Sequence, residues 1–150
     1  MKWNGKASIA FSKLCVILFT IVAMGILFTA PWLTNCFVHF SRAHIVQLQK
    51  YFMATIYSAA VFIFPILWLL WQLLVQIGKE NVFILENVQR LRRISWCCFA
   101  VAIVCLISTV YYLPYLFLAA MAAFMALIVR VVKNIMQQAV ELKDENDYTI

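Results

Sequence analysis

The sequence predicts an all-α integral membrane protein with four transmembrane helices packed as an antiparallel bundle. Hydrophobic residues make up 66% of its 150 residues and charged residues only 12%, whereas a soluble domain has about half and about a quarter. Three long stretches lack any Asp, Glu, Lys or Arg: residues 14–41, 51–78 and 94–129. Each can hold a membrane-spanning helix, and the third is long enough for two. We therefore expect a single transmembrane domain.

A hydrocarbon core of about 30 Å requires about 20 apolar residues, which places the four spans at residues 14–33, 51–77, 95–113 and 115–132. Pro114 separates the last two, because proline cannot donate a backbone hydrogen bond inside a helix, so we expect a tight hairpin there. The first span follows several lysines, as a signal peptide does. Its apolar run is longer than a typical signal core and Pro31 follows Ala30, so we expect a retained signal anchor.

The basic residues predict that both termini are cytoplasmic, because loops rich in Lys and Arg are retained on that side. With the amino terminus inside, ten basic residues are cytoplasmic: Lys2, Lys6, Lys13, Lys79, Arg90, Arg92, Arg93, Arg130, Lys133 and Lys143. Only Arg42 and Lys50 lie outside. This distribution accounts for the net charge of +6 without direct nucleic-acid binding.

Aromatic residues agree with this orientation, because Trp and Tyr favour the interface between lipid and water. The outer boundary contains Trp32, Tyr51, Tyr111, Tyr112 and Tyr115. The inner boundary contains Trp68, Trp71 and Trp96.

The outer loop, residues 34–50, holds His39, Arg42 and His44. Two histidines five residues apart without a carboxylate or a second cysteine make a poor metal site, so we expect no metal there. The apolar residues that alternate with the polar ones in this loop predict an amphipathic helix on the outer leaflet: Phe37, Val38, Phe40, Ile45 and Leu48.

The inner segment, residues 78–93, is the most patterned polar part of the chain. Gly78 can end the second span and Asn81 can cap a new amphipathic helix. Glu86 and Arg90 stand four residues apart in the favourable order. The cluster Arg90, Arg92 and Arg93 fits either contact with anionic lipid headgroups or docking of an acidic partner.

The tail, residues 133–150, reverses the sign of the charge with Glu141, Asp144, Glu145 and Asp147. Three interpretations remain open: a solvated end, contact with the inner arginines, or a docking site for a basic cytoplasmic protein. We predict that the arginines and these acids face each other as one partner-binding surface, because both segments leave the membrane on the same side.

Two features of the spans concern helix packing. Ala119, Ala122, Ala123 and Ala126 form a small-residue surface on the fourth span, suited to close packing against another span or another copy of the chain. Pro65 lies inside the second span and predicts a local kink, either a static bend or a hinge.

The sequence lacks the patterns of common enzymes. None of the spans has an ionisable residue well inside, which weakens a proton-coupled transporter. The cysteines, Cys15, Cys36, Cys97, Cys98 and Cys105, form no Cys-x-x-Cys motif and are interpreted as small hydrophobic residues. With three glycines in the chain, a phosphate-cradling loop is not expected. We expect no catalytic residue, cofactor or metal.

The ending Leu142-Lys143-Asp144-Glu145-Asn146-Asp147-Tyr148-Thr149-Ile150 resembles the carboxy-terminal signature of a bacterial four-span family catalogued as domain of unknown function 2975. The inner segment, in which Phe83 precedes Leu91 and Ile94, is similar to that family's cytoplasmic helix. This resemblance implies a bacterial, mainly Gram-positive, cytoplasmic membrane and no established enzymatic activity. It also implies that a small helix-turn-helix regulator is often encoded beside such a protein.

Two functional classes follow. The first is a non-enzymatic membrane-bound sensor or interaction protein that holds a cytoplasmic partner, such as a helix-turn-helix DNA-binding regulator. The alternative is a small oligomeric transport or immunity protein. The first needs its cytoplasmic surfaces and the second needs a polar path between helices, so the patterned inner segments favour the first.

Overall fold

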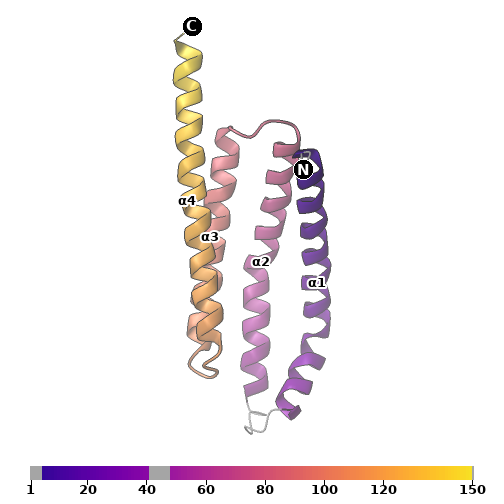
Figure 1. The fold of residues 1–150 in the computed structure, drawn as a ribbon. Coiled ribbons are helices and arrows are strands. Elements are labelled where there is room, and N and C mark those ends of the chain that lie inside the picture. The colour runs from indigo at the N-terminus through magenta and orange to yellow at the C-terminus, as the bar shows by residue number, and fades with distance from the viewer. Residues whose placement is uncertain (1–4, 41–47, 150) are drawn as a thin grey trace.

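A computed structural model describes residues 5–40 and 48–149, which form four α-helices (Figure 1). They are α1 (Gly5–Phe40), α2 (Gln49–Gly78), α3 (Leu85–Ser108) and α4 (Tyr115–Tyr148). Each is long and apolar enough to cross a membrane, and no strand occurs in these ranges. The predicted all-helical, four-span fold class is confirmed. The protein is a multi-pass membrane protein.

The helices pack in chain order rather than as a closed ring. Extensive contacts join α1 to α2, α2 to α3, and α3 to α4, and the last pair is the most intimate. Figure 1 shows neighbouring helices running in opposite directions, with α1 beginning and α4 ending at the same end of the molecule. Most of the apolar surface faces outward, as at Phe28, Val110 and Phe117. Lipid covers such a surface in a membrane, so it costs no exposure of apolar groups to water.

The helices extend beyond the expected spans at several points. Helix α1 continues to Phe40, so residues 34–40 of the predicted outer loop are helical. It passes through Pro31, and Thr34 donates a hydrogen bond back to the carbonyl of Ala30 (2.7 Å). The rest of that loop up to residue 47, with Arg42 and His44, lies outside the described residues. Of the residues that predicted an interfacial helix, Phe37, Val38 and Phe40 belong to α1.

The connection between α3 and α4 is longer than the expected turn at Pro114. Helix α3 ends at Ser108, five residues before the predicted end of the third span at Leu113. Residues 109–114 form successive turns, in which the amide of Tyr112 bonds to the carbonyl of Ser108 (3.2 Å). A residue that precedes proline disfavours helical geometry, so the helix ends before it reaches Pro114.

The connection between α2 and α3 corrects the predicted helix cap. Helix α2 ends at Gly78 as expected, but α3 begins only at Leu85, and its N-cap residue is Ile84, in extended geometry without a side-chain cap. Asn81 therefore does not cap it. From Leu85 the helix continues unbroken into the span, so the segment is no separate interfacial helix.

Glu80, rather than a glycine, supplies the left-handed residue that ends α2, with φ of 64°. The amide of Asn81 bonds to the carbonyl of Gln76 (3.2 Å), and the amide of Glu80 bonds to that of Ile77 (3.1 Å). These two bonds form the Schellman motif that closes many helices. Glycine usually occupies this position because other residues pay a steric cost there.

Candidate functional site

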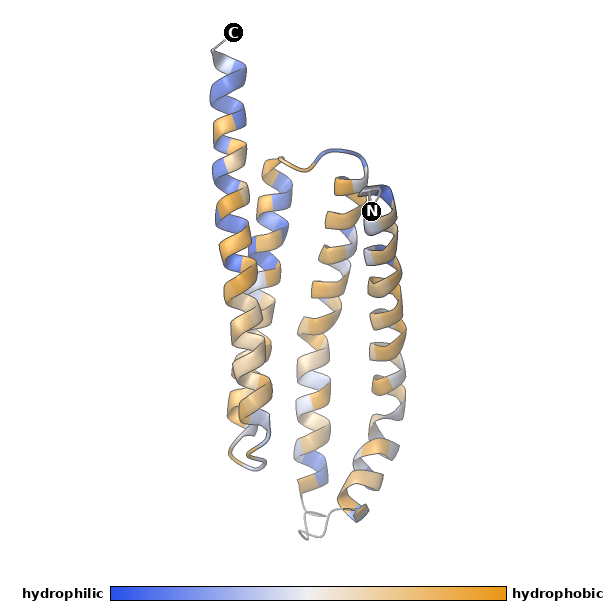
Figure 2. Ribbon diagram, in the orientation of Figure 1, coloured by the Kyte–Doolittle hydropathy of each residue, from blue (hydrophilic) through white to orange (hydrophobic). Residues whose placement is uncertain are grey.

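The polar side chains gather at the end of the molecule where α2 connects to α3 and where α4 ends. Figure 2 shows this end coloured hydrophilic, with hydrophobic colour over most of the remaining helix surface. The inner arginines and the acidic tail both belong to it.

Asn87 forms hydrogen bonds that stabilise the connection between α2 and α3. Its side chain has no exposed surface, and its amide nitrogen donates to the carbonyls of Asn81 (2.9 Å) and Val82 (3.0 Å). Its amide oxygen accepts a hydrogen bond from Arg90 (2.8 Å). All of its polar atoms are therefore engaged, as a buried amide requires.

The inner arginines differ in their exposure to solvent. Arg90 is partly buried and bonds to Glu86 at 3.2 Å, which confirms the predicted pair. Arg92 and Arg93 are exposed. The Arg90–Glu86 pair is the one salt bridge among residues 5–40 and 48–149.

The acidic tail is helical and separate from the arginines. Residues 141–149 are all exposed, and Glu141 accepts a hydrogen bond from Gln137 on the same helix (3.1 Å). Asp144, Glu145 and Asp147 follow on further turns of α4.

The register of α3 and α4 explains this separation. Ser95 bonds to the carbonyl of Ala126 (2.9 Å), so Arg90, five residues earlier on an antiparallel helix, is level with about residue 131. Asp144 is 13 residues further along α4, which is about 20 Å at about 1.5 Å per residue. The predicted face-to-face arrangement of arginines and acids therefore does not form in the described part of the chain.

At the opposite end of the molecule, aromatic rings from α1, α2, α4 and the turn between α3 and α4 pack against one another. Phe52 on α2 is surrounded by Phe37, Tyr111, Tyr112 and Tyr115, with ring centroids 5.3–6.0 Å apart. The hydroxyl of Tyr111 bonds to Thr55 and to the carbonyl of Tyr51 (3.2 Å). These contacts attach the turn between α3 and α4 to α2.

Hydroxyl groups within the spans form hydrogen bonds between two helices and within single helices. Thr55 and Ser108 join α2 to α3 at 2.7 Å. Thr20, Ser58 and Thr109 each bond to a carbonyl of their own helix at 2.8–3.2 Å.

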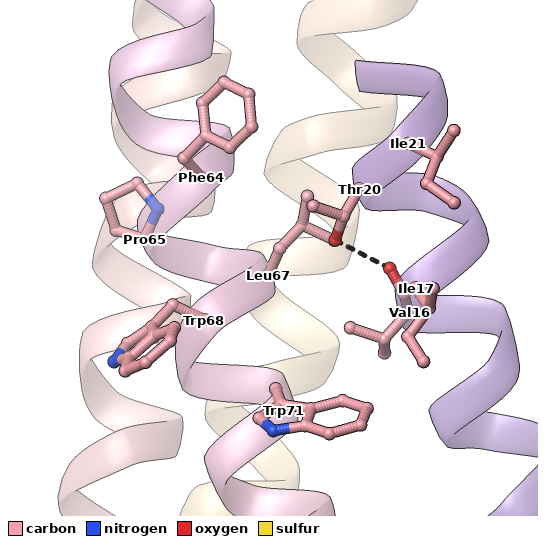
Figure 3. A pocket seen from close by; sticks show the side chains of 9 residues that line it. All are labelled: Val16, Ile17, Thr20, Ile21, Phe64, Pro65, Leu67, Trp68 and Trp71. Atoms are coloured by element: carbon pink, nitrogen blue, oxygen red, sulfur yellow. Dashed lines mark hydrogen bonds between the residues drawn. The ribbon is translucent and has the colours of Figure 1, made fainter. Parts of the chain in front are cut away.

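Two cavities between the helices are lined mainly by apolar side chains. One, about 780 Å³, lies between α1 and α2 beside Pro65, and Figure 3 shows Leu67 and Trp71 extending from α2 toward α1. A second, about 410 Å³, is lined by residues of all four helices. Neither contains an ionisable acid or base other than Tyr115 and Cys105, so neither forms a charged path for ions. Helix α2 continues without interruption through Pro65. That Pro65 acts as a hinge stays a prediction.

The small residues of α4 lie mainly toward α3. Ala119 and Ala126 are buried, and the carbonyl of Ala126 accepts the bond from Ser95 described above. Ala122 and Ala123 are partly exposed, and Ala122 lines the four-helix cavity. Within the chain, this surface contributes to the contact between α3 and α4.

The sequence analysis missed Asn87 and Ser95. Asn87, Leu91 and Ile94 share one face of α3 at helical spacing, so a single polar residue on an otherwise apolar stripe was the available signal. Ser95 had no such signal, because its role depends on which carbonyl of another helix lies opposite.

The family model described as "Protein of unknown function (DUF2975)" matches residues 43–150, a range that contains α2, α3 and α4. No curated protein matches the chain, and no solved structure matches it. Among the described residues, no group of three or more His, Cys, Asp or Glu side chains is placed to hold a metal ion.

Proposed function

Because the chain belongs to the DUF2975 family, whose description assigns no activity, we propose a function from its own geometry: a non-enzymatic membrane-bound sensor or interaction protein. It holds a cytoplasmic partner through the last turns of α4. The membrane is the cytoplasmic membrane of a bacterium, with both termini inside, in keeping with the distribution of basic residues.

The observation that carries this proposal is the exposed acidic end of α4. Residues 141–149 hold four carboxylates and one lysine, and every one of them is exposed. Figure 1 shows α4 continuing well past the beginning of α3. A partner can therefore surround this helix without displacing any intramolecular salt bridge of the described residues.

The charge of this segment selects the class of partner. A helix with a net formal charge of −3 over these residues attracts a protein with a basic surface and repels an acidic one. Leu142 is 66% exposed within the same segment and offers an apolar contact to such a partner. A small helix-turn-helix regulator carries basic residues for DNA, so it fits this surface.

The continuity of α4 supports a sensing role. The helix runs without interruption from Tyr115, in the membrane, to Tyr148, in the acidic end. A shift or rotation of the spanning part is carried to the exposed part, because an uninterrupted helix moves nearly as a rigid rod. A change in the envelope that displaces α4 would thereby alter the presentation of the acidic residues.

The test is binding of a small basic helix-turn-helix regulator, the kind of partner that the family resemblance implies, to the full chain in lipid nanodiscs at moderate salt. The triple variant Asp144→Asn, Glu145→Gln, Asp147→Asn should weaken binding by at least about tenfold, because several charge contacts are removed together. Asn146→Ser, an uncharged change on the same turns, should leave the affinity within about twofold.

Deletion of residues 141–150 should abolish capture while the four spans still insert. Undiminished affinity of the truncated protein would overturn the proposal.

A further inference from the structure

A small basic pocket lies between α3 and α4, apart from the acidic end of α4. It encloses about 180 Å³ and is lined by Arg92, Ser95 and Trp96 of α3 and by Arg130 and Lys133 of α4. We call these five residues the basic pocket. Arg92, Ser95 and Trp96 share one face of their helix at spacings of three and four residues, and Arg130 and Lys133 are likewise three apart.

Two contacts build this pocket. The hydroxyl of Ser95, which is buried, donates to the carbonyl of Ala126 at 2.9 Å and holds α3 close to α4. The guanidinium carbon of Arg130 lies 5.5 Å from the ring centroid of Trp96, a cation–π contact. It holds the guanidinium on the indole while leaving its N–H groups available to donate hydrogen bonds to an anion in their plane.

The basic pocket lies deeper along the helices than the charged residues Lys79 and Glu80 that follow α2. Thr55 and Ser108 are in contact at 2.7 Å and provide a common reference level. Arg92 is 16 residues from Ser108 along α3, whereas Gly78, beside Lys13 of α1, is 23 residues from Thr55 along α2. At about 1.5 Å per residue these lengths are about 24 Å and about 35 Å.

The backbone of Arg92 is therefore roughly 10 Å nearer the middle of the membrane than that of Gly78. At this depth, the headgroups of the surrounding lipid are the nearest source of counter-charge.

No carboxylate lines the basic pocket. Glu86 lies nearer the start of α3 than the pocket and forms a salt bridge with Arg90. The acidic residues at the end of α4 lie more than two turns beyond Lys133. The ammonium of Lys133 donates a hydrogen bond to the neutral amide oxygen of Asn134 (2.9 Å). Arg92, Arg130 and Lys133 line one small pocket without an acidic neighbour among its lining residues. Like charges repel one another, and an anion that enters between them reduces this repulsion.

We propose that the basic pocket binds the phosphate of an anionic phospholipid headgroup. Arg92, Arg130 and Lys133 donate charge-assisted hydrogen bonds to its oxygens, and Trp96 lies at the interface where the headgroup meets the acyl chains. The depth of the site selects a lipid phosphate over a phosphate from solution. The proposal is independent of the protein partner at the α4 end.

Native mass spectrometry of the full chain released from nanodiscs tests this directly. In a mixture of phosphatidylcholine and phosphatidylglycerol, the protein should retain one phosphatidylglycerol preferentially. The double variant Arg130→Gln, Lys133→Gln should reduce this retention by at least about tenfold, the effect expected from losing charge-assisted hydrogen bonds. Arg93→Gln, which removes a charge from the neighbouring exposed position outside the pocket, should leave it within about twofold.

Two outcomes would overturn the proposal. Equal loss in Arg93→Gln and in the double variant means that diffuse charge, not the pocket, attracts the lipid. Retention of inorganic phosphate by the protein in pure phosphatidylcholine, at the level seen for phosphatidylglycerol, means that the ligand is a free anion. Because the double variant relieves repulsion between cations, it should fold at least as well as the wild type. A raised thermal midpoint of the wild type in phosphatidylglycerol, absent in the double variant, is the supporting second measurement.

Discussion

Replacement of Asn87 by alanine should loosen the connection between α2 and α3. The change removes two donors to the carbonyls of Asn81 and Val82 and the acceptor for Arg90. Each neutral hydrogen bond contributes about 1 kcal/mol and one to a charged group somewhat more, for a sum of about 3 kcal/mol. Alanine regains roughly 0.6 kcal/mol through its higher helix propensity. We therefore expect a net loss of about 2 kcal/mol in the free energy of unfolding.

The assay is reversible unfolding of the purified protein in mixed micelles by increasing sodium dodecyl sulfate, followed by circular dichroism. The matched control is Gln89→Ala, an exposed position two residues away on α3, which should change the free energy of unfolding by less than about 0.5 kcal/mol. Asn87→Asp retains the acceptor for Arg90 but presents an oxygen to two carbonyls, so it should destabilise the protein as well.

Hydrogen exchange localises the effect. The amides of residues 79–84 should exchange faster in Asn87→Ala, while those of α2 near Thr55 should not change, because that end is held by separate contacts. Equal stabilities of Asn87→Ala and Gln89→Ala, with unchanged exchange at residues 79–84, would refute the assigned role of Asn87.

Further predictions concern the ends and contacts of single helices. Glu80→Gly should raise the free energy of unfolding by about 1 kcal/mol, because glycine adopts the left-handed geometry of Glu80 without steric cost; a decrease in the same unfolding titration would argue against this. Ala126→Phe should disrupt the contact of α3 with α4 while leaving membrane insertion intact, seen as a lower thermal midpoint in detergent. Tyr111→Phe should cost about 1 kcal/mol through its lost hydroxyl bonds, and an unchanged stability would contradict it. Pro65→Ala should straighten α2, measured as a longer distance between spin labels at its two ends; a distance equal to that of the wild type would show that no bend exists.

Much of the fold could be predicted from the sequence because it follows from local properties. The four helices and the hairpin between the last two follow from runs of apolar residues and from Pro114. The end of α2 at Gly78 was also predicted, although Glu80 and not the glycine adopts the left-handed conformation there. The Glu86–Arg90 pair was predicted because both residues lie on one helix, where spacing alone sets their distance. The family was recognised from the chain's ending and from Phe83, Leu91 and Ile94, and the family match confirms it.

The predicted surface of arginines and acids does not form among the described residues, because local sequence patterns do not give the distance between groups on different helices. Topology places both groups at one end of the molecule, but their separation depends on the register of α3 against α4. Ser95 and Ala126 set this register, and it moves Asp144 about 20 Å from the level of Arg90. The helix cap was wrong because Asn81 had the right residue type, but α3 begins only at Leu85, so Ile84 occupies the N-cap position.

By itself, the sequence determined that this protein resides in a membrane, how many helices cross it, and which segments carry charge, because hydropathy and helix length are properties of consecutive residues. Only the tertiary structure decided that Trp96 lies on Arg130, that Arg92 and Lys133 share one pocket, and that Asn87 fastens the α2–α3 connection. These contacts depend on the axial register and rotation of helices against one another and against the loops between them. Many packed side chains set that register together, so no single segment encodes it.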